Sequence, residues 1–155
     1  MELKYSKFIT GIKNCPKNCV PKSKPAYRYI HDLGNEEDFL PMSLQNSPPA
    51  RILDNNDKHC MSYGISFFES AIQAREKFLH YYNKKNEELQ QLYLIEKGNK
   101  IACVNITEED GLCSETDKYG HFTFYDFINI TFVDKISNLV NVIIEELGVN
   151  GEADK

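Results

Sequence analysis

The chain has no Trp and no long apolar run, and its aromatic side chains are nine Tyr and nine Phe. Runs of only a few apolar residues exclude a segment that spans a bilayer, so we expect no membrane partner. The first ten residues also lack the apolar core of a signal peptide. Five Cys is an odd number, which favours free thiols over disulfides. These features predict a soluble, cytoplasmic protein.

Charge is distributed unevenly along the 155 residues. Residues 1–25 carry six Lys and one Glu, a net charge of +5, whereas the whole chain carries −5 and the remainder therefore −10. The basic segment contains no Arg and has three Pro within residues 16–25. We interpret it as a solvated arm or irregular entry segment. We expect no contact with nucleic acid except through this segment, because the acidic remainder would repel phosphates.

The size and the 41% hydrophobic content fit one domain, which we assign to residues 26–148, followed by a frayed tail at 149–155. Alternating or β-rich segments predict strands near 26–32, 61–67, 100–106 and 121–130. A helix should begin at Ala71, where Ser70 and Gln73 form a capping-box pattern, and another should occupy 86–98. Residues 41–58 read as a long polar loop.

The most regular apolar pattern lies near the C-terminus and predicts a third helix over about 134–147, ended by Gly148. Its members are spaced for one helical face: Ile136, Leu139, Val140, Ile143, Ile144 and Leu147. The predicted fold is therefore an α+β domain with a small mixed or antiparallel sheet of about four strands and about three helices. The apolar helix face could be core or a surface for a partner.

Ser66 lies where a predicted strand runs into a helix, a position that often carries a nucleophile. A nucleophile elbow has the form Gly-x-Ser-x-Gly, and here Gly64 is present but Phe68 replaces the second Gly. Packing, with Ser70 as the helix cap, is the simpler interpretation of this junction.

A zinc site would need Cys15 and Cys19 with later ligands. The later Cys and His residues that could complete it are His59, Cys60, Cys113 and His121. Structural zinc sites use two tight ligand pairs, and this chain has one loose pair, so we predict no metal and no cofactor. His121 is also a candidate base, although a lone His beside aromatic residues is more often a hydrogen-bonded core residue.

Arg28, Ser66 and an acid, Glu108 or Glu109, follow the order used by one class of ADP-ribosyltransferases. Arg could clamp a pyrophosphate and Glu could stabilise a ribosyl cation. The Ser-Thr-Ser run and Glu-x-Glu turn of that family are replaced here by "ISFF" and "TEED".

The order of "AYRYIHDL", "HCMSYGISFFESAIQA", "KIACVNITEEDG" and "GHFTFY" resembles a group of small uncharacterised bacterial proteins. The resemblance covers about residues 25–127 and implies a bacterial cytoplasmic domain. It points to Arg28, Cys60, Ser66, Gly111 and His121, although the second His and the Trp of that group are replaced here by aromatic and Thr residues.

Two functional hypotheses follow. The first is a non-enzymatic binding or interaction module, whose partner is another protein or the chain itself. The alternative is a nucleotide-using transferase built on Arg28, Ser66 and Glu108 or Glu109.

Overall fold

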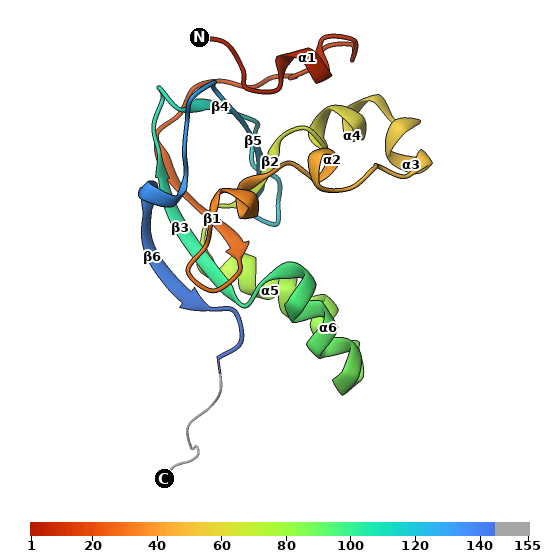
Figure 1. The fold of residues 1–155 in the computed structure, drawn as a ribbon, viewed down its shortest axis with the longest axis vertical. Coiled ribbons are helices and arrows are strands. Elements are labelled where there is room, and N and C mark those ends of the chain that lie inside the picture. Colours follow the sequence, from red (N-terminus) through yellow and green to blue (C-terminus); the bar gives the residue numbers. More distant parts are fainter. Residues whose placement is uncertain (145–155) are drawn as a thin grey trace.

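A six-stranded antiparallel sheet forms the framework of the chain (Figure 1). This computed structural model describes residues 1–144. The strand order is β4-β5-β2-β1-β3-β6. The strands are β1 (Lys24–Ile30), β2 (Ile65–Phe68), β3 (Lys100–Ile106), β4 (Gly111–Cys113), β5 (His121–Asp126) and β6 (Ile136–Asn141). The α+β class is as predicted, but the expectation of about four strands was wrong. One of the extra strands, β4, has only three residues, too few for a visible alternation.

The helices also exceed the predicted number of about three. They are α1 (Ser6–Ile9), α2 (Met42–Gln45), α3 (Ala50–Leu53), α4 (Asn56–Met61), α5 (Ala71–Tyr82) and α6 (Glu87–Lys97), with 3₁₀ turns η1 (Glu36–Phe39) and η2 (Val133–Lys135). Three of the short helices lie in the segment 41–58 or just beyond it, where we expected a loop. A helix of one turn cannot display a repeating apolar stripe, so the sequence pattern misses it.

The C-terminal helix predicted over 134–147 was also wrong. Residues 136–141 form β6, which pairs antiparallel with β3. Asp134 and Lys135 belong to a 3₁₀ turn, and residues 142–144 lie in neither a helix nor a strand. Leu147 and Gly148 lie outside the described residues, as does the predicted tail.

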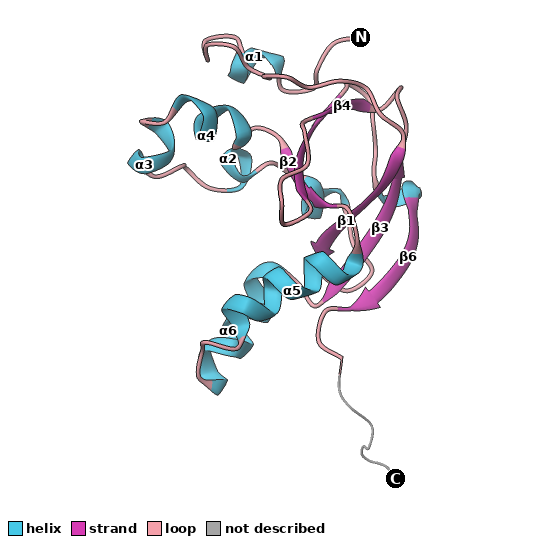
Figure 2. Cartoon of the chain, turned by 180° about the vertical axis from the view of Figure 1, so that it is seen from behind, coloured by secondary structure: helices cyan, strands magenta, loops and turns pink. Residues whose placement is uncertain are grey.

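The two long helices were predicted closely because their caps are local. Ser70 accepts a hydrogen bond from the Gln73 amide at 3.2 Å, and Asn86 accepts one from the Leu89 amide at 2.9 Å. The helices form a hairpin beside the sheet, at one end of the molecule (Figure 2). Phe78 of α5 is fully buried there.

The sheet is strongly curved (Figures 1 and 2). Its two faces carry side chains of different clusters. One face holds the largest core cluster, which includes Ile65, Phe67, Phe122 and Phe124. Because side chains alternate along a strand, Ser66, His121, Thr123 and Tyr125 belong to the other face. Phe68 on this second face packs against α5 in a separate cluster.

The N-terminal segment lies against the domain. Ile9 and Ile12 are 5% and 8% exposed and pack with Tyr125 in a third cluster. Val20 forms an antiparallel bridge with Cys113 of β4. Residues 1–25, which the sequence set apart, therefore contribute side chains to buried contacts. In the described part of the chain, every helix is too short or too polar to cross a membrane.

Candidate functional site

Ser66 Oγ and His121 Nε2 are hydrogen-bonded on the second face of the sheet, opposite to the face of the largest core cluster. Ser66 of β2 lies opposite Thr123 of β5, so His121 is its diagonal neighbour across the two strands. Side chains in this relationship are close enough to interact. The Ser66 residue is exposed, whereas the His121 side chain is 24% exposed. A hydroxyl open to solvent thus meets an imidazole that is mostly covered.

Asp117 stands on the opposite side of the imidazole, with Oδ2 3.9 Å from Nδ1 of His121. Its other oxygen, Oδ1, accepts hydrogen bonds from the Tyr119 and His121 amides, both at 2.9 Å. These bonds hold the carboxylate in a tight turn. Gly120 has a φ of 82°, a left-handed conformation that favours glycine and directs the chain into β5.

Burial lowers the pKa of His121, and the positive charges of Lys77 and Arg28 lower it further, while Asp117 opposes them. Desolvation is the largest of these effects because it disfavours the imidazolium ion. At neutral pH, His121 is therefore mainly the uncharged imidazole, which can accept a proton.

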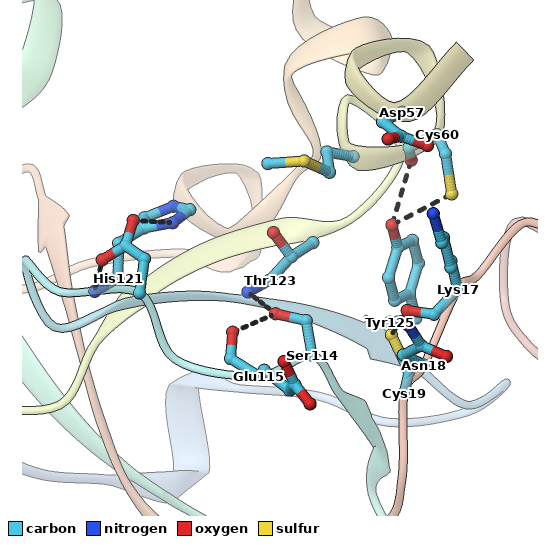
Figure 3. A pocket seen from close by; sticks show the side chains of 12 residues that line it. Lys17, Asn18, Cys19, Asp57, Cys60, Ser114, Glu115, His121, Thr123 and Tyr125 are labelled. Carbon is cyan, nitrogen blue, oxygen red and sulfur yellow. Dashed lines mark hydrogen bonds and ion pairs between the residues drawn. The ribbon is translucent and has the colours of Figure 1, made fainter.

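A pocket of about 270 Å³ begins at His121 and extends along β5 (Figure 3). It is bounded by residues 17–19 of the N-terminal segment, by α4 and by residues 114–117. Its lining contains three carboxylates, Asp57, Glu115 and Asp117, but Lys17 as the single ammonium group. With His121 uncharged, the lining carries a net charge of −2. Met61 and Tyr125 add apolar surface to the same lining.

Thr123 lies in the lining of this pocket and is 4% exposed (Figure 3). Its backbone amide donates to Ser114 Oγ at 2.8 Å. Among the described residues, the Thr123 hydroxyl has no hydrogen-bond partner. Its oxygen keeps some contact with solvent. A buried hydroxyl that reaches solvent only through a pocket is available to a ligand.

Arg28 does not join this site. Its guanidinium donates to the backbone carbonyls of Asp38 at 2.7 Å, Ser66 at 2.8 Å and Leu40 at 3.4 Å. Burial lowers the pKa of Arg28 to about 10, against the attraction of Asp38. Arg28 lies on the strand face of Ala26 and Ile30, opposite to the face of the Ser66 side chain. The hydrogen bonds of the Arg28 guanidinium therefore link the η1 segment to β2.

Glu108 and Glu109 are exposed in the turn after β3. Arg28 pairs with Ala102, and Ile106 at the end of β3 lies four residues beyond it, about 13 Å along the strand. The glutamates come after that point. The Glu108 amide donates to Ser23 Oγ at 3.1 Å, and the Glu109 amide donates to Thr107 Oγ1 at 3.3 Å. Arg28, Ser66 and these acids consequently do not converge in one cleft.

The cysteines differ from the expectation of free thiols, because Cys15 and Cys60 form a disulfide with Cα atoms 5.6 Å apart. Cys15 therefore cannot pair with Cys19 as a zinc ligand. The described residues contain no cluster of three or more His, Cys, Asp or Glu side chains able to hold a metal. Gly111 starts β4, where a side chain would collide with the Tyr125 carbonyl, so its role is close packing.

Sequence reasoning named Ser66 and His121 separately but missed Asp117 and Thr123. The spacing of Asp117, Gly120 and His121 was a local signal, since Asp before a turn commonly accepts from amides two to four residues later. The pairing of Ser66 with His121 had no such signal, because it depends on the register of β2 with β5.

Comparison with protein-family models, with curated proteins and with solved structures finds no match to this chain.

Proposed function

We propose that the chain is a binding module that holds a small organic cation, such as a primary amine, in the pocket beside β5. A lysine side chain of a partner protein presents the same group, which agrees with the expectation of a protein partner. The observation that carries the proposal is the Thr123 hydroxyl, which has no hydrogen-bond partner within residues 1–144 and lies in a lining with three carboxylates and one ammonium group.

Charge and shape both support a cation. Asp57 of α4 and Glu115 of the β4–β5 loop belong to different elements around the pocket (Figure 3). Asp117 of the same loop also lines it. Carboxylates and a hydroxyl are acceptors for the N–H groups of an ammonium ion. Met61 and Tyr125 can cover a short aliphatic chain attached to it. The volume of about 270 Å³ limits the buried part of the ligand to a side-chain-sized group.

NMR titration of amide resonances with n-butylamine and with butyrate tests the sign of the charge at constant chain length. We expect butylamine to shift resonances at 17–19, 57–61 and 114–125, and butyrate to leave them unchanged. N-acetyl-lysine amide forms a further arm, since tighter binding of this compound favours a lysine side chain over a free amine. Equal shifts with butyrate would reject the proposal.

Thr123→Val removes the hydroxyl with little change in shape. A hydrogen bond to a charged group contributes about 1.5–3 kcal/mol, so this variant should bind butylamine at least about tenfold more weakly. Glu88→Gln removes an acid from the distant helix α6 and should bind as the unchanged chain does. If both variants bind equally well, the pocket is not the binding site.

A further inference from the structure

Ser66, His121 and Asp117 form a chain of three groups, of which the proposed cation site uses Asp117 but gives no role to the Ser66–His121 pair. The Ser66 hydroxyl is exposed and hydrogen-bonded to Nε2 of His121, and Nδ1 of the same ring faces Asp117 at 3.9 Å. A hydroxyl joined to an imidazole that a third group orients is the arrangement of an activated nucleophile. The pocket of about 270 Å³ begins at the same imidazole and leaves room for a substrate.

We propose that Ser66 is a nucleophile, with His121 as its base, that accepts acyl or phosphonyl groups from activated electrophiles. With an ester, Ser66 Oγ forms the new bond to the carbonyl carbon, and its proton moves to Nε2. The bond from that carbon to the leaving oxygen breaks, and the alcohol departs with the proton from His121. Water then attacks the acyl-Ser66 ester with His121 again as base, which releases the acid and restores the hydroxyl.

The electrostatic surroundings suit this step. Tyr119 and His121 amides fix Asp117, which in turn favours the tautomer with the proton on Nδ1 and leaves Nε2 free to accept. Lys77 of α5 and Arg28 of β1 place positive potential at the ring. The same potential stabilises negative charge that develops beside Ser66 Oγ.

The position of Ser66 also sets the speed of the reaction. The residue lies within β2, without the sharp turn that gives an elbow serine two free amides for the oxyanion. Loss of one such donor costs about 10²–10³ in rate. We therefore expect stoichiometric modification and slow turnover rather than rapid hydrolysis.

A biotinylated fluorophosphonate is the direct probe, since attack by Ser66 Oγ forms an O–P bond and expels fluoride, and it needs no cationic group. Intact-mass and peptide mass spectrometry should find one adduct, on Ser66, and none in Ser66→Ala. Labelling should be at least tenfold slower in His121→Gln. Ser137→Ala alters an exposed strand serine in β6 and should label as the unchanged chain does.

The pH profile separates a catalytic role of His121 from a structural one. The labelling rate should rise with increasing pH as the ring loses its proton. The midpoint of this rise should lie below about pH 6.5, the ordinary pKa of histidine. Asp117→Asn removes the charge that raises the pKa of His121, so the midpoint should move to lower pH. Thermal melts confirm that each variant is folded. An adduct on another residue, or equal labelling rates of folded His121→Gln and the unchanged chain, would overturn the proposal.

Discussion

Lys4 and Asp126 form an ion pair, with Nζ and Oδ2 3.0 Å apart, and the Asp126 side chain is only 2% exposed. The Lys4 ammonium also donates to the Ile130 carbonyl at 2.7 Å. The backbone amide of Lys4 donates to the Asp126 carbonyl at 2.9 Å. Burial raises the pKa of Asp126, and the attraction of Lys4 acts against this increase. The segment before β1 thus supplies the cation for a carboxylate that lies inside the domain.

Lys4→Met should destabilise the fold by about 3 kcal/mol at pH 7, because it leaves Asp126 buried without its cation. Asp126 has a raised pKa in the folded state, so its protonated form is favoured there. The destabilisation should therefore be complete above the folded pKa of Asp126 in the variant and should fade as the pH falls towards the lower folded pKa of Asp126 in the unchanged chain. Urea unfolding at pH 7 and pH 4.5 measures this, with Lys7→Met, an exposed lysine, as control. A loss of equal size at both pH values would contradict the account.

Deleting residues 1–22 should lower the melting temperature strongly, contrary to what the basic composition of this segment suggests. Ile9 and Ile12 are buried against Tyr125, and each fully buried aliphatic side chain contributes about 1.5–3 kcal/mol. Ile12→Ala tests the contact by itself and should cost about 2 kcal/mol or more. Ile72→Ala, at a position that is 67% exposed, is the matched control and should change little.

The N-terminal segment illustrates why composition was a poor guide to packing. Its lysines and prolines indicated an arm. Its few apolar residues, among them Ile9 and Ile12, contradicted this without a period that the sequence could reveal. Their burial depends on the disulfide partner Cys60 and on Tyr125, both distant in sequence. Local features were predicted well, such as the Ser70 cap of α5, whose side chain accepts from the Gln73 amide at 3.2 Å.

In the candidate site, too, local features could be predicted from the sequence and long-range contacts could not. The Asp117 turn is local, and Ser66 and His121 were recognisable as chemically capable residues. Their hydrogen bond exists because β2 and β5 pair with Ser66 opposite Thr123, and a register shift of one residue would turn Ser66 to the other face. Register is set by the whole core, so spacing alone could not reveal this pair.

His31 and His121 should titrate on opposite sides of the ordinary histidine pKa of about 6.5. The hydrogen bond from His31 to Asp38, at 2.7 Å, raises the pKa of His31, whereas burial lowers that of His121. NMR titration of the ring protons separates the two. Asp38→Asn should lower the pKa of His31 and leave that of His121 unchanged.

These two shifts have opposite effects on stability. His31 contributes stability below the unfolded pKa, and this is lost as the pH rises through its higher folded pKa. For His121, the unfolded chain binds the proton more readily, so stability is lost as the pH falls through the unfolded pKa. The same shift direction for both rings would show that one of these contacts is absent in solution.

The segment 136–144 offered two patterns, and the spacing of its aliphatic residues selected the wrong one. Ile136, Leu139, Val140 and Ile143 fit a helical stripe, but β-branched residues make up most of the aliphatic content, which favours a strand. As a strand, β6 gains hydrogen bonds from the exposed edge of β3. The pairing includes a register shift between Cys103 and Val104, which obscures a simple alternation.

Val142 distinguishes strand from helix in this segment, because a helix with the predicted stripe would turn Val142 towards solvent. In the structure, Val142 is fully buried with Phe68, Phe78 and Ile101, and its amide donates to the Asn99 carbonyl at 3.0 Å. Val142→Ala should therefore cost about 2 kcal/mol in urea unfolding. Ile143→Ala, at a half-buried position, should cost less. If Ile143→Ala were the more damaging change and Val142→Ala nearly neutral, the segment would be helical in solution and β6 would be incorrect.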